Sequence, residues 1–170
     1  MASGQRNVRA LEVASLVPNA VYYNATLNPP RTECTLPRGA WHGAALRALE
    51  QTDLVFLDPD NGLIVKSVGP GSAKSIKYVM PDELRDYYRS GKSVVFYNHR
   101  CRQPVDTYLE RFRNLKHDPV FESAEWLGLA FSAWVIRDFI LQPHHATAVR
   151  ASVNEHLDGL WQERTYRLPI

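Results

Sequence analysis

Two apolar runs, each typical of a buried strand, constrain the fold of this chain most. Leu54–Leu57 is apolar at every position, and Ser93–Tyr97 repeats the pattern after a stretch typical of a helix from about Pro81 to Ser90. A strand that is apolar on both faces is typical of a central parallel strand covered by helices. Because a single helix separates the two runs, we expect them to be parallel neighbours.

The rest of the chain continues the alternation of helices and strands. Apolar positions at helical spacing predict helices over residues 8–17, 41–49, 104–115 and 145–160. Short apolar runs predict strands over residues 20–23, 119–121, 132–141 and 164–168. With no repeat and no low-complexity linker, residues 1–170 are predicted to form a single α/β domain. Its predicted architecture is a three-layer Rossmann-like sandwich with a mostly parallel sheet and an antiparallel edge.

Composition limits the classes of partner and the location. The 20 basic and 18 acidic residues give a formal charge of +2, so a surface for nucleic acid has to be a local basic patch. Cys34 and Cys101 lack metal-ligand spacing and predict no disulfide framework. No signal sequence and no apolar stretch of about 18 residues is present, which predicts a cytoplasmic protein without a membrane partner.

The segment Asp58–Gly62 is the strongest candidate for chemistry because it directly follows the first apolar run. Ligands of open α/β sheets bind beyond the carboxyl ends of the strands. Asp58 and Asp60 can act as bases, bind a cation or accept from an amino group, and Asn61 can donate and accept. The alternative is a plain turn in which Asp and Asn bond their own backbone and Gly takes a positive φ.

The second apolar run ends in Asn98, His99 and Arg100. If the two strands are parallel neighbours, these residues meet the Asp58–Gly62 segment at one sheet edge. His99 then suits acid–base chemistry near neutral pH. The predicted catalytic residues are Asp58, Asp60, Asn61 and His99.

The loop from Gly62 to Lys77 combines small residues with lysines, a composition that can cradle phosphate. It matches neither glycine-rich nucleotide motif, so a flexible solvated loop is the alternative. The predicted partner is a nucleic acid or a phosphate-bearing small molecule. The predicted substrate-binding residues are Lys66, Lys77, Asn98 and Arg100.

Residues 52–102 resemble a known group of proteins. The stretches DLVFLDPDNGL, KYV and GKSVVFYNHR are similar to those of uncharacterised bacterial and phage proteins with a DPDNGLE-type motif. An acidic residue commonly occupies the place of Ile64 in that group.

More distantly, a strand that ends in Asp58-Pro59 resembles motif IV of Rossmann-like methyltransferases that modify amino groups of nucleic-acid bases. That resemblance implies S-adenosylmethionine as cofactor and a methyltransferase-related domain that acts on nucleic acid. Asp60 and Asn61 stand where that motif has a proline and an aromatic residue. The glycine-rich cofactor motif is absent, since only Gly4 precedes Gly39.

Two other functions remain open from the sequence. The first is a metal-dependent hydrolase or phosphoryl-transfer enzyme, in which Asp58 and Asp60 hold Mg²⁺ or Mn²⁺ and His99 is the acid or base. The second is a non-catalytic module on a degenerate Rossmann scaffold that binds nucleic acid or protein.

Overall fold

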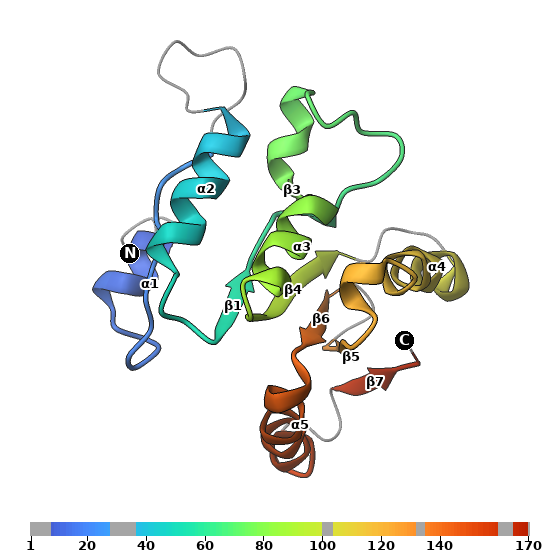
Figure 1. The fold of residues 1–170 in the computed structure, drawn as a ribbon. Helices are drawn as coiled ribbons and strands as arrows, with labels where there is room; N and C mark the ends of the chain where they lie inside the picture. Colours follow the sequence, from blue (N-terminus) through green and yellow to red (C-terminus); the bar gives the residue numbers. More distant parts are fainter. Residues whose placement is uncertain (1–7, 28–36, 100–103, 132–134, 160–164, 170) are drawn as a thin grey trace, which may run out of the picture. The chain divides into compact units, whose positions relative to one another are not determined.

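A computed structural model describes residues 8–27, 37–99, 104–131, 135–159 and 165–169 (Figure 1). The chain divides into two compact units, residues 1–52 and 53–170, which we describe separately. The prediction of one domain stays a prediction. The helices are α1 (Val8–Val13), α2 (Arg38–Ala48), α3 (Pro81–Arg89), α4 (Val105–Lys116), α5 (Pro143–Leu157) and the 3-10 helices η1 (Ala73–Lys77) and η2 (Pro119–Phe121). The strands are β1 (Leu54–Leu57), β2 (Gly62–Leu63), β3 (Tyr78–Val79), β4 (Ser93–His99), β5 (Glu125–Ala130), β6 (Val135–Leu141) and β7 (Tyr166–Leu168).

The first unit contains α1, α2 and an irregular segment between them. The strand predicted over residues 20–23 is wrong, because this segment has no regular structure. The ring of Tyr23 packs on that of Trp41 in α2 with 5.6 Å between centroids, and its hydroxyl donates to the Trp41 carbonyl at 3.1 Å. Trp41 Nε1 donates to the Ala25 carbonyl at 2.8 Å. Side-chain contacts with a helix therefore fix the segment, without a partner strand.

The second unit is built on a five-stranded mixed sheet. Its strand order is β1-β4-β6-β5-β7, and β1 and β4 form the one parallel pair among these described strands. The pairs β4–β6, β6–β5 and β5–β7 are antiparallel. The predicted Rossmann-like sandwich with a mostly parallel sheet is therefore wrong. A separate two-stranded parallel ladder joins β2 to β3.

The wrong prediction of a mostly parallel sheet comes from the part of the chain between α4 and β6. Residues 119–121, predicted as a strand, form η2, because Asp118 Oδ1 accepts from the Val120 amide at 3.0 Å and starts a helical turn. The strand that follows, β5, was not predicted. It pairs with the next strand in the chain, β6, and such a direct connection requires antiparallel strands.

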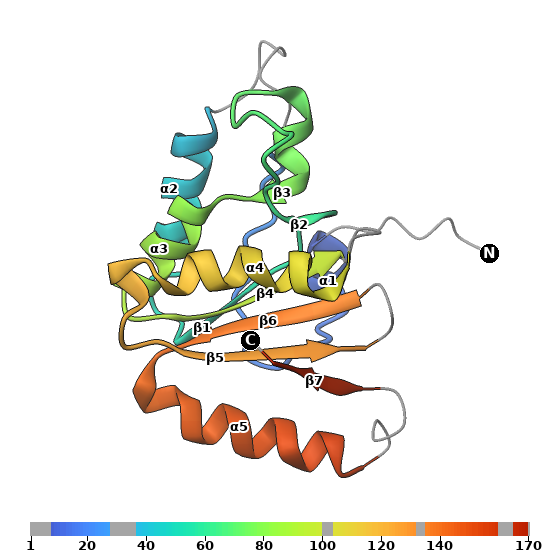
Figure 2. The same cartoon turned by 90° about the vertical axis from the view of Figure 1, so that its right-hand side faces the viewer.

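Helices lie on both faces of this sheet, as Figure 2 shows for α4 and α5. Phe96 of β4 packs against Phe112 of α4, with 6.2 Å between ring centroids, and we call this side the α4 face. The opposite side, which we call the α5 face, carries Phe139 opposite Val95. There Phe139 and Val149 of α5 line one cavity.

The first apolar run is not a central strand. β1 lies at an edge of the described sheet, and its side chains alternate between a covered and an open face. Val55 is 3% exposed, whereas Leu54 is 42% and Phe56 50% exposed. The run is apolar throughout, yet only the α4 face of β1 is covered among the described residues.

The elements nearest the candidate motif follow the prediction. β1 and β4 are parallel neighbours, with Leu57 opposite Phe96. The intervening helix α3 begins with Pro81 and is followed by Gly91 at φ +83°. No helix among the described residues has the length and apolar character needed to cross a membrane.

Candidate functional site

The Asp58–Gly62 segment leaves the carboxyl end of β1 in an exposed position. Asp58 and Asp60 are both exposed. The Asp60 carboxylate pairs with Lys77 Nζ at 3.4 Å, and both side chains are more than half exposed. Such an ion pair contributes little to stability. Lys77 of the predicted binding loop thus lies beside one of the two predicted catalytic carboxylates.

Backbone contacts bring the two predicted motifs together. The Asn61 amide donates to the Lys77 carbonyl at 2.9 Å, and the His99 amide donates to the Asn61 carbonyl at 3.5 Å. The end of β4 therefore lies next to the turn that follows β1, as the parallel pairing predicts.

Alternation along β4 places Asn98 and His99 on opposite faces of the sheet. His99 is exposed, and its Nδ1 lies 3.1 Å from the Tyr97 hydroxyl. Asn98 is fully buried and bonded within the protein at both ends of its amide. Arg100 lies outside the described residues. Lys66 is exposed on the loop after Gly62.

Next to His99, three side chains form what we call the aromatic face: Phe56, Tyr97 and Arg137. Tyr97 lies directly opposite Arg137 in the β4–β6 ladder, and Phe56 lies opposite Val95, two residues before Tyr97. The Arg137 guanidinium carbon is 4.6 Å from the Tyr97 ring centroid and 5.6 Å from that of Phe56. Both distances fall within the range of cation–π contact. No carboxylate of the described residues forms an ion pair with Arg137.

The aromatic face was missed by sequence reasoning. Its signal is an arginine inside the apolar strand Val135–Leu141, at the position that faces the same side as Tyr97. Half of the Phe56 surface remains accessible, which is unusual for phenylalanine in a strand. Exposed aromatic surface beside a cation is a feature of ligand-binding surfaces.

Behind the motif, on the α4 face, lies a polar cluster of Asn98, Tyr108, Arg111 and Asp138 that we call the Asp138 ring. Asn98 Oδ1 accepts from the Leu63 amide at 2.7 Å, and Asn98 Nδ2 donates to Asp138 Oδ2 at 2.6 Å. The Tyr108 hydroxyl donates to the same Asp138 oxygen at 3.1 Å. Arg111, one turn further along α4, donates to the Leu63 carbonyl and acts on Asp138 through its charge.

Asp138 is fully buried, and its Oδ1 has no hydrogen-bond partner among the described residues. Burial raises the pKa of Asp138 to about 7, although the bonds from Asn98 and Tyr108 and the charges of Arg111 and Arg137 lower it. Desolvation therefore outweighs four interactions that favour the anion.

The described residues contain no group of three or more His, Cys, Asp or Glu side chains able to hold a metal ion. A metal at Asp58 and Asp60 stays a prediction, as does S-adenosylmethionine. A cavity of about 470 Å³ lies between α5 and the sheet, and none of its lining residues belongs to the Asp58–Gly62 segment.

Comparison with protein families, with curated proteins and with solved structures gives no match to this chain. The resemblance to proteins with a DPDNGLE-type motif therefore stays a prediction.

Proposed function

We propose that this chain is a binding module for single-stranded nucleic acid, and that unpaired bases stack on the aromatic face. The observation that carries the proposal is the Arg137 guanidinium, which lies over the rings of both Tyr97 and the half-exposed Phe56. Three residues from three adjacent strands thus form one surface of π-systems, in which Phe56 is exposed and Tyr97 and Arg137 are partly buried.

The chemistry of this surface suits bases better than it suits other ligands. Every base has a flat π-face, so aromatic side chains and arginine can stack on it without regard to sequence. Each stacked base contributes roughly 1–3 kcal/mol. In a duplex the bases are already stacked, and their faces are closed to a protein surface. The proposed ligand is therefore single-stranded.

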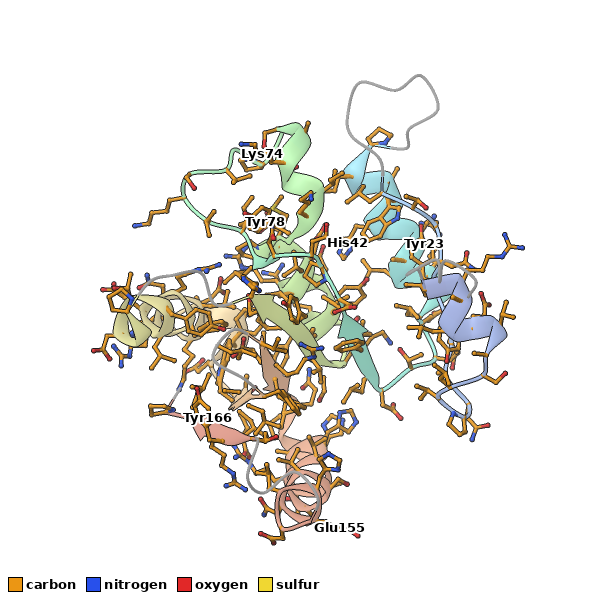
Figure 3. All side chains as sticks on the ribbon, turned by 180° about the vertical axis from the view of Figure 1, so that it is seen from behind. Tyr23, His42, Lys74, Tyr78, Glu155 and Tyr166 are labelled. Atoms are coloured by element: carbon orange, nitrogen blue, oxygen red, sulfur yellow. The ribbon has the colours of Figure 1, made fainter. Side chains whose placement is uncertain are left out.

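Exposed lysines on the loop after Gly62 and on η1 favour an anionic backbone. Lys66 and Lys74 are exposed on the loop and on η1, where Figure 3 labels Lys74. Lys77 is half exposed beside Asp60. Their contribution is electrostatic and independent of sequence, so it should weaken as salt increases.

The proposal keeps the non-catalytic binding module predicted from the sequence but not its Rossmann scaffold. The methyltransferase function stays a prediction, whereas the mostly parallel Rossmann-like sheet predicted with it is contradicted by β5, β6 and β7. A surface for bases requires no cofactor, and it adds Arg137, which lies outside the stretches that carry the resemblance.

The test is fluorescence anisotropy with labelled 15-mers of dT and rU and with a duplex of equal length. Phe56→Ala removes one ring, and Tyr166→Ala on β7 is its matched control. Both residues are 50% exposed aromatic side chains in strands at opposite edges of the sheet. Figure 3 labels Tyr166. We expect Phe56→Ala to weaken binding of the single strand about tenfold, the effect of losing one stacked base.

Tyr166→Ala should bind within twofold of the wild-type protein, and the duplex should bind more weakly than either single strand. Equal losses in the two variants, or a preference for the duplex, would contradict stacking on the aromatic face. Absence of binding at low salt would reject the proposed function itself.

A further inference from the structure

The backbone of Leu63, directly after the Asp58–Gly62 segment, is held on both sides by the Asp138 ring. Its amide donates to Asn98, and its carbonyl accepts from Arg111. Both of these side chains also interact with Asp138, one through a hydrogen bond and the other through its charge. The position of the turn is thus coupled to one buried carboxyl group.

The two oxygens of the Asp138 carboxyl group differ in their hydrogen bonds. Oδ2 accepts from Asn98 on β4 and from Tyr108 on α4, whereas Oδ1 is buried with no partner in the part of the chain that the structure describes. The charged groups that act on it are Arg111 from α4 and Arg137 from β6 itself. A neutral acid tolerates this environment, whereas a buried anion with one unpartnered oxygen is costly.

Arg111 is the group that can remove this cost. It is a half-buried cation that donates to the neutral Leu63 carbonyl, and it lies close enough to Asp138 to favour the anion. A guanidinium bonds more strongly to a carboxylate than to a carbonyl. Arg137 is held differently, since its guanidinium lies over Tyr97 on the α5 face.

We propose that Asp138 and Arg111 form a pH-dependent latch on the Gly62–Leu63 turn. In the closed state Asp138 is neutral and Arg111 binds the Leu63 carbonyl. When Asp138 loses its proton, Arg111 turns to Asp138 Oδ1 and releases that carbonyl. The proton goes to solvent, and no covalent bond changes.

The raised pKa of Asp138 places this exchange near neutral pH, so the closed state is populated below about pH 7 and the open state above it. Opening frees the Leu63 carbonyl from Arg111 and leaves the bond to Asn98 and the β2–β3 pairing in place. The effect should reach the aromatic face through Asn98, which lies between Tyr97 and His99 on β4. This last step rests on the proposed function, whereas the movement of the turn does not.

The experiment follows the amide resonances of Gly62 and Leu63 by NMR from pH 5.5 to 8.5. We expect both to titrate with a midpoint near 7 in the wild-type protein and to be flat in Asp138→Asn. His99→Gln is the control, because it changes the residue next to Asn98 and leaves Asp138 and its partners in place. It should leave the titration of both amides in place.

A second variant avoids a change at the buried carboxyl group itself. Tyr108→Phe removes a hydrogen bond that favours the anion, so the midpoint should move upward by about half a pH unit or more. A flat wild-type titration would overturn the latch, as would an unchanged midpoint in Tyr108→Phe or loss of the titration in His99→Gln.

A parallel measurement of oligonucleotide affinity over the same pH range separates the two proposals. If the turn titrates but no oligonucleotide binds, the latch stands and the proposed function fails. If binding occurs and Leu63 does not respond to pH, the latch fails alone.

Discussion

Gly62 lies directly against Asn98: a β-carbon at position 62 would be 2.7 Å from the Asn98 α-carbon. Its backbone also has φ +90°, a conformation that other residues seldom adopt. The last residue of the DPDNG motif is therefore fixed both by its backbone conformation and by the closeness of β4.

Gly62→Ala should destabilise the protein strongly, whereas Gly91→Ala should have a smaller effect. Both glycines have positive φ, but the space around Gly91 is open. The left-handed conformation costs about 1–2 kcal/mol for alanine, and overpacking against Asn98 adds roughly 1–3 kcal/mol. Urea denaturation measures the free energy of unfolding of both variants. Equal losses would show that the closeness of Asn98 has no consequence.

The stability of the protein should fall as pH rises from about 4 to 7, because of Asp138. Its pKa is about 7 in the folded protein and about 3.9 in an unfolded chain. The folded state therefore binds more protons in this window, and the free energy of unfolding decreases as pH rises through it, on the order of a few kcal/mol. Above about pH 7 this contribution is constant.

Denaturation of the wild-type protein and of Asp138→Asn at several pH values tests this sign. The variant should lack the decrease, because its amide does not titrate. A wild-type stability that rises from pH 4 to 7 relative to the variant would refute the assignment.

The contribution of Asp118 to the free energy of unfolding should increase as pH rises, opposite to that of Asp138. The amide of Val120 and the Arg85 guanidinium bond its carboxylate and lower the pKa of Asp118. This stability is present at neutral pH and is lost as pH falls through the lowered pKa of the folded state. Asp118→Asn keeps an acceptor for Val120 and should cost about 1 kcal/mol, and Asp118→Ala about 2 kcal/mol. The gap between wild type and Asp118→Asn should close in acid, as urea titrations at pH 7 and 3 can show.

Arg137→Lys should weaken oligonucleotide binding about tenfold even though the charge is kept. A lysine ammonium lacks the planar guanidinium that lies over Tyr97 and Phe56 and that can stack on a base. Anisotropy titrations compare it with Arg150→Lys, a change on α5 at an arginine paired with Glu125. Full affinity in Arg137→Lys would mean that only charge matters.

Mg²⁺ or Mn²⁺ at millimolar excess should leave the melting temperature unchanged. Asp60 is paired with Lys77, and the described residues hold no group of three metal-binding side chains. Thermal melts with and without each ion provide the measurement. A rise of several degrees that is lost in Asp60→Asn would instead support the metal-dependent hydrolase predicted from the sequence.

The sequence predicts the elements around the motif because their signals are local. Pro81 and Gly91 bracket α3, and the apolar runs of β1 and β4 on either side of one helix lead to parallel neighbours. The mixed sheet could not be predicted in the same way. Glu125–Ala130 begins with a polar residue, contains Gly128 and ends with a small residue, so its local propensity for a strand is weak. It forms a strand because it pairs with β6 and β7.

The candidate site was predicted only in part for a related reason. The meeting of Asn61 with His99 follows from strand order, but exposure depends on what covers each face. Phe56 was expected in the core and is half exposed, whereas Asn98 was expected to contact substrate and is fully buried. The adjacent Arg137 and Asp138 point to opposite faces of an apolar strand, and this pair was the one sequence signal for both the aromatic face and the Asp138 ring.

The three residues of the aromatic face are separated by about forty residues each along the chain and belong to β1, β4 and β6. The surface therefore exists only after two long loops have closed and both a parallel and an antiparallel pairing have formed. An unfolded or half-folded chain would have no equivalent surface. A ligand bound there would act as a folding ligand: at a free concentration of about one hundred times its Kd, it would add roughly 2.7 kcal/mol to the free energy of unfolding.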